Sequence, residues 1–136
     1  MRKLFVFLLI TCLIFTTFTT VAFAEEASPF AIPERTKVSN YYYTIYENDE
    51  PIAELHFRVT GIWSQTDNFS QMTDFEVVSS PPYVYITNVY ISGNKLFSDL
   101  YYGNIFIGEL EFTIYTNGNM SAYINYPNGS SAVLDY

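Results

Sequence analysis

The single histidine of the chain is the first residue to consider for chemistry. His56 lies between Glu54 and Arg58, in a segment where polar and apolar residues alternate. An imidazole can act as a general base or bind a metal. A base also needs an orienting acid within reach, and Glu111 holds the equivalent position in a similar downstream segment. One alternative is therefore a hydrolase that uses His56 with a nearby carboxylate. The alternation favours a second alternative, in which His56 is simply an exposed histidine on a strand.

The acidic residues offer a second kind of site. Glu47, Asn48, Asp49 and Glu50 follow one another directly. Calcium prefers several oxygen ligands, but this spacing does not match an EF-hand loop, so the run is predicted to be a solvated hairpin turn. The sequence also contains no glycine-rich phosphate loop and no Cys/His cluster. It predicts no catalytic residues, no metal and no cofactor.

Tyrosine is the distinctive residue of this chain, with thirteen copies that all follow residue 40. Tyrosine combines a rigid apolar body with a polar tip and is enriched in binding surfaces. An outward stripe of such rings would stack on sugars or dock a protein, whereas the plainer alternative is cross-strand aromatic packing. The phase along each predicted strand indicates the outward candidates, which are Tyr42, Tyr46, Tyr83, Tyr85, Tyr115 and Tyr123.

The elements that would position these rings are strands. From residue 40 onward Tyr, Phe, Ile, Val and Thr dominate, and Asn and Gly recur where tight turns need positive φ. The predicted strands are 40–47, 52–63, 72–79, 83–92, 95–102, 105–116, 120–126 and 131–135. Such spacing predicts an all-β fold, an antiparallel eight-stranded sandwich or a partly closed barrel. The predicted core contains Leu55, Phe57, Val59, Phe75, Ile86, Leu110, Phe112, Ile114 and Ile124.

Two of these segments resemble each other. Residues 52–59 and 107–114 align without gaps, and both alternate with a period of two. That period places one face of a strand in the core and the other in water. One interpretation is a duplication, with two four-stranded meanders over 40–92 and 95–135 packed face to face. The other is that amphipathic hairpins resemble one another by chance.

The N-terminus has the layout of a secretory signal peptide. Arg2 and Lys3 precede an uncharged apolar run, and Ala22-Phe23-Ala24 forms a small-x-small cleavage pattern. A membrane anchor and lipidation at Cys12 are the weaker alternatives. We therefore expect a signal peptide over 1–24, an extended leader over 25–39 and a single β domain over 40–136. The only cysteine would leave with the signal peptide, and an exported chain without cysteine suggests a bacterial source.

Charge limits the choice of partner. Removal of residues 1–24 leaves four Lys and Arg residues and all fourteen Asp and Glu residues, a formal charge of −10. This excess argues against nucleic acid and against anionic membranes. The sequence therefore predicts a secreted, non-enzymatic binding domain for a carbohydrate or a protein. The alternative is a carrier that holds a small apolar ligand inside a closed barrel. The ligand and the oligomeric state do not follow from the sequence.

Overall fold

The computed structural model describes residues 34–136, so the predicted signal peptide and most of the predicted leader lie outside the described residues. These residues form eight strands and contain no helix able to cross a bilayer. The strands are β1 (Arg35–Glu47), β2 (Glu50–Ser64), β3 (Phe69–Ser79), β4 (Val84–Ser92), β5 (Lys95–Tyr102), β6 (Ile105–Ile114), β7 (Met120–Asn125) and β8 (Ser131–Val133). β1 begins within the predicted leader, because Arg35 already pairs with Trp63 of β2.

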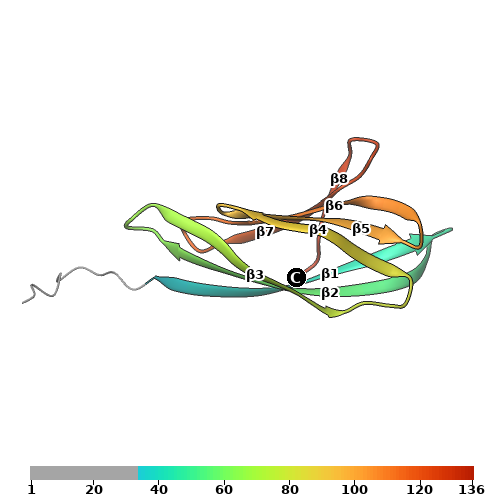
Figure 1. The fold of residues 1–136 in the computed structure, drawn as a ribbon, viewed down its shortest axis with the longest axis horizontal. Coiled ribbons are helices and arrows are strands. Elements are labelled where there is room, and N and C mark those ends of the chain that lie inside the picture. Colours follow the sequence, from blue (N-terminus) through green and yellow to red (C-terminus); the bar gives the residue numbers. More distant parts are fainter. Residues whose placement is uncertain (1–33) are drawn as a thin grey trace, which may run out of the picture. The chain divides into compact units, whose positions relative to one another are not determined.

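The strands form two antiparallel sheets. One has three strands in the order β1-β2-β3, and the other has five in the order β4-β5-β6-β7-β8 (Figure 1). The all-β prediction is confirmed, and the fold is a sandwich, because the sheets of residues 34–136 do not close into a barrel. A carrier with a ligand inside a closed barrel therefore lacks its structural basis.

The partition into three and five strands differs from two equal meanders. β4 was predicted to complete the first half, but it pairs with β5 and belongs to the second sheet. The reason is local, since Ser92 pairs with Lys95 and leaves only Gly93 and Asn94 in the turn, where Gly93 has a φ of 60°. A two-residue loop between antiparallel strands makes a hairpin. The chain instead changes sheets between β3 and β4 (Figure 1).

The core lies between the two sheets and follows the predicted alternation. In β2, Leu55, Phe57 and Val59 are fully buried, whereas Glu54 and Arg58 are exposed. Seven of the nine predicted core residues have no exposed surface, and the other two, Phe75 and Ile86, are partly buried against them. Phe57 meets Phe112 of the opposite sheet edge to face at 5.9 Å. This aromatic contact between the central strands contributes to packing beyond the burial of area.

The C-terminal segment connects the two sheets. Ala132 pairs with Ile124 of β7, and the backbone of Asp135 then pairs with Tyr42 of β1, with N···O distances of 2.7 and 3.2 Å. Leu134, between these two pairings, is buried. The segment thus covers part of the free edge of β1 and leaves the rest of that edge open.

Candidate functional site

His56 lies on the outer face of the three-stranded sheet. Its Nε2 is 3.0 Å from Oδ1 of Asn40, and its ring stacks on Tyr42 with a centroid distance of 4.6 Å. Glu111 lies opposite Tyr123 on the outer face of the other sheet and receives a hydrogen bond from Lys95 at 2.5 Å. The two residues are equivalent in pattern, but two sheets packed face to face place them on opposite outer surfaces. Glu111 is therefore not the acid that orients His56.

The acidic run is a hairpin turn. Glu47 pairs with Glu50, and the two residues between them, Asn48 and Asp49, have φ values of 51° and 64°. Positive φ at both central positions is the type I′ geometry that joins twisted antiparallel strands. Among residues 34–136 no three His, Cys, Asp or Glu side chains are placed to hold a metal ion.

All six tyrosines predicted to point outward are exposed, between 37% and 68%. They do not form one stripe. Tyr42 and Tyr46 belong to β1, and Tyr83 lies in the connection before β4 with a φ of 78°. Tyr85 and Tyr123 lie on the outer face of the five-stranded sheet. Tyr115 follows β6, with its hydroxyl 3.2 Å from Oγ of Ser121. The phase of a strand thus predicts exposure but not which rings are neighbours.

Six aromatic rings lie on the outer face of the five-stranded sheet, in two clusters. We call this set the aromatic face, and it consists of Tyr85, Tyr90, Phe97, Tyr101, Phe106 and Tyr123. Tyr85 pairs with Tyr101, which in turn pairs with Phe106 at a ring distance of 5.3 Å. These three residues form a row across β4, β5 and β6. Tyr90 stacks on Phe97 at 5.0 Å in a second cluster, about 13 Å from the first along β5 if each residue rises about 3.3 Å.

A polar belt separates the two aromatic clusters. It consists of Asn88, Asp99, Glu109, Asn125 and Ser131. Asn88 donates to Asp99 at 2.5 Å, and Ser131 donates to Asn125 at 2.7 Å. Glu109 lies between these two pairs and makes no side-chain hydrogen bond to any residue within 34–136. The belt therefore holds oriented donors and acceptors together with an available carboxylate.

Four members of the aromatic face were not among the predicted site residues, namely Tyr90, Phe97, Tyr101 and Phe106. Alternation within 95–102 alone would have placed Phe97 and Tyr101 opposite the buried Leu96 and Leu100. Tyr90 and Phe106 follow no simple alternation, because the pairing shifts between Thr87 and Tyr90 and between Leu100 and Tyr101. A β-bulge changes the face on which later residues point, and the sequence did not mark either shift.

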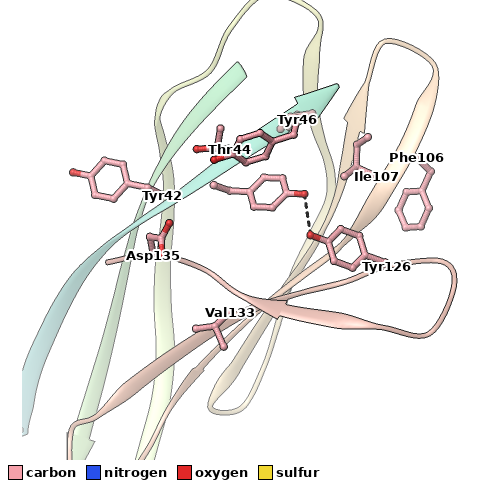
Figure 2. A pocket seen from close by; sticks show the side chains of 10 residues that line it. Tyr42, Thr44, Tyr46, Phe106, Ile107, Tyr126, Val133 and Asp135 are labelled. Atoms are coloured by element: carbon pink, nitrogen blue, oxygen red, sulfur yellow. Dashed lines mark hydrogen bonds between the residues drawn. The ribbon is translucent and has the colours of Figure 1, made fainter. Parts of the chain in front are cut away.

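A second candidate is a groove at the open edge of β1. It has a volume of about 530 Å³ and lies between β1 and residues of β6, of β8 and of the turn that joins β7 to β8 (Figure 2). It is lined by Tyr42, Tyr43, Thr44, Ile45, Tyr46, Phe106, Ile107, Tyr126, Val133 and Asp135. Two of the six predicted tyrosines, Tyr42 and Tyr46, belong to this groove and not to the aromatic face.

Tyr43 and Tyr126 join the two walls of the groove. Their hydroxyl oxygens are 3.2 Å apart, and this is the contact drawn as a dashed line in Figure 2. Burial is the main cause that raises the pKa of Tyr43 above its ordinary value, and the hydrogen bond to Tyr126 adds to it. The groove thus contains a hydrogen-bonded pair of tyrosine hydroxyls, and the one carboxylate in its lining belongs to Asp135.

Comparison with family models, with curated proteins and with solved structures finds no match for this chain.

Proposed function

We propose that this protein is a secreted, non-enzymatic binding domain whose aromatic face contacts a carbohydrate chain. The observation that carries the proposal is the row Tyr85–Tyr101–Phe106 beside the polar belt, on a face that no other element of residues 34–136 covers. Exposed apolar area gathered in one place, with polar groups around it, is typical of interaction sites.

The chemistry of a sugar fits this arrangement. The face of an aromatic ring is negative and attracts weakly positive C–H groups, which one side of a pyranose ring presents. Its hydroxyl groups need donors and acceptors at fixed positions. Asp99, Glu109 and Asn125 supply these between the two aromatic clusters. In a typical binding site, aromatic rings position the ligand and a few polar groups select it.

The proposal is non-enzymatic because His56 has an amide and a stacked ring as its neighbours, Asn40 and Tyr42. A general base needs an acid or a nucleophile within hydrogen-bond reach. A protein partner is the alternative ligand for the same face. It becomes the preferred one if the purified protein binds no polysaccharide.

Export through a cleaved signal peptide is part of the proposal. It is supported by the basic residues Arg2 and Lys3, by the apolar run and by Ala22-Phe23-Ala24. After cleavage the chain would hold no cysteine and would carry a strong negative charge. This favours solubility and weakens contact with anionic membranes. Release from the cell, in a bacterium, is the expected outcome.

The test is calorimetric titration of the purified protein with soluble xylan, mixed-linkage glucan and chitin oligomers. The double variant Tyr85→Ala/Tyr101→Ala should bind the preferred glycan at least about tenfold more weakly, since one buried ring contributes roughly 1.5–3 kcal/mol. Tyr46→Ala removes an equally exposed ring away from the aromatic face and should bind like the unchanged protein. Binding to none of the glycans, or equal affinity of the double variant, would contradict the proposal.

A further inference from the structure

We propose that the groove along β1 binds an extended, positively charged peptide segment, which continues the three-stranded sheet at the free edge of β1. This site shares only Phe106 with the aromatic face and does not depend on the carbohydrate proposal. Four observations carry it: the open backbone edge, the apolar walls, the charge of the lining, and the obstacles to a second copy of the chain.

The first observation is the backbone of β1. β1 is an edge strand, and its outer side is paired only at Tyr42, whose N–H and C=O contact Asp135. In an extended strand every second residue directs its backbone groups to the same side, so Thr44 presents its N–H and C=O to the groove. Val133, which precedes the bridge, pairs with Tyr123 of β7 instead. No strand of the described residues occupies the position beside Thr44.

The second observation is the side-chain lining. Tyr46 stands at one end of the open edge, and Ile107 and Tyr126 line the opposite side of the groove (Figure 2). A peptide added to a sheet edge directs alternate side chains to opposite faces, so half of them would enter the groove and meet these rings. Backbone hydrogen bonds would then give affinity, and the rings would select apolar side chains.

The third observation is charge. Among the described residues that line the groove, Asp135 is acidic and none is Lys, Arg or His. The turn after β1 adds Glu47, Asp49 and Glu50 next to Tyr46. Carboxylates and tyrosine faces both attract ammonium and guanidinium groups. An acidic peptide would be repelled at the same place, so the lining selects a basic segment.

A second copy of this chain fits less well. Residues 34–136 contain twelve Asp and Glu against four Lys and Arg, a formal charge of −8. Because Tyr42 is occupied by Asp135, antiparallel pairing of two β1 edges within the groove would use Thr44 to Glu47. It would bring two acidic turns together. Like charges at close range oppose such pairing.

The experiment is fluorescence anisotropy of a labelled short peptide of alternating lysine and valine, added to the purified protein. Binding should weaken as salt is added. A peptide of alternating glutamate and valine should bind at least about tenfold more weakly. The lysine peptide with N-methyl groups on its backbone keeps every charge and side chain but loses donors, and it should also bind at least about tenfold more weakly. Equal binding of the N-methylated or the acidic peptide would overturn the proposal.

Two variants locate the site on the protein. Thr44→Pro removes an N–H that faces the groove and not β2, so the β1–β2 ladder keeps its bonds. Tyr46→Ala removes a ring of the lining. Both should weaken binding of the lysine peptide, and Tyr90→Ala, in the aromatic cluster that does not touch the groove, should leave it unchanged. If sedimentation instead shows a dimer that Tyr46→Ala dissociates, the groove is occupied by a second copy and the peptide proposal is wrong.

Discussion

Individual tyrosines in this protein have different roles according to the face on which they lie. Tyr41 and Tyr43 point into the sandwich, Tyr42 covers the ring of His56, and Tyr85 faces solvent beside Tyr101. Burial raises the pKa of Tyr41 and of Tyr43, because an apolar environment disfavours the phenolate. The inward tyrosines therefore act as core residues with a polar tip, and the outward ones are available to a ligand.

The raised pKa of Tyr43 predicts a loss of stability at alkaline pH. Below about pH 10 the phenol is protonated in both states. Above that value the unfolded chain releases the proton while the folded chain keeps it, so the free energy of unfolding falls as pH rises. Tyr43→Phe should reduce the fall in the free energy of unfolding. The part of the fall that remains is due to Tyr41. At neutral pH the variant should lose about 1 kcal/mol with the Tyr126 hydrogen bond.

Urea unfolding at several values between about pH 8 and 11 measures this effect. Tyr85→Phe, which removes a hydroxyl from an exposed ring, is the control and should follow the unchanged protein. An identical pH dependence for Tyr43→Phe and the unchanged protein would show that Tyr43 does not contribute to the alkaline transition.

Alternation along single strands predicted which side chains are exposed, but it did not predict which side chains are neighbours. It placed Leu55, Phe57 and Val59 inside and all six candidate tyrosines outside, because the side-chain period of a strand depends only on the strand itself. Which rings touch depends on the pairing of strands far apart in sequence. For that reason the row Tyr85–Tyr101–Phe106 and the separation of His56 from Glu111 became visible only in the structure.

The strands themselves were predicted with ends that differ by a few residues, because Asn and Gly mark the turns that separate them. The irregular positions were not predicted. Pairing shifts interrupt four of the ladders, including the one between Thr87 and Tyr90, where Asn88 has a φ of 51°. Such bulges are selected by tertiary contacts and not by a residue type alone. They decide which side of the sheet receives Tyr90.

The turn between β6 and β7 packs closely against Trp63. Gly118 has a φ of 82°, and a Cβ at this position would collide with the ring of Trp63 from β2. Gly118→Ala should therefore destabilise the protein by about 2–4 kcal/mol, from backbone strain and overpacking together. Gly93 also has a positive φ, 60°, but has open space around it.

Gly93→Ala is thus a matched control that isolates the strain, and it should cost only about 1–2 kcal/mol. Thermal unfolding of the two variants gives the difference directly. If both variants lose the same free energy of unfolding, Gly118 does not pack closely against Trp63 in solution.

For the whole molecule, the sequence predicted an all-β sandwich or partly closed barrel, but not the division into three and five strands. The similar segments 52–59 and 107–114 are β2 and β6, the strands that bury their apolar faces against each other through Phe57 and Phe112. Both strands bury one face and expose the other, so the same alternation of apolar and polar residues is expected with or without a duplication. The hairpin of β4 with β5 then fixed the unequal division.

Export predicts two properties of the molecule as a whole. If cleavage follows Ala24, intact mass spectrometry of the protein recovered from the medium should give a chain that starts at Glu25. Since Cys12 is the only cysteine, this form should also unfold at the same temperature with and without a thiol reductant. A mass that retains residues 1–24, or a reductant-sensitive melting temperature, would contradict the predicted processing.

The place where the chain changes sheets has a consequence for the integrity of the molecule. Ser79 ends the last strand of one sheet and Val84 begins the first strand of the other, so a single backbone cut between them would divide the protein along its core. Each fragment would expose an apolar sheet face that only the other fragment covers. The two fragments would therefore have to associate before either one folds. This connection is thus a suitable cleavage point for a split-protein reporter, in which a signal depends on the association of two fragments.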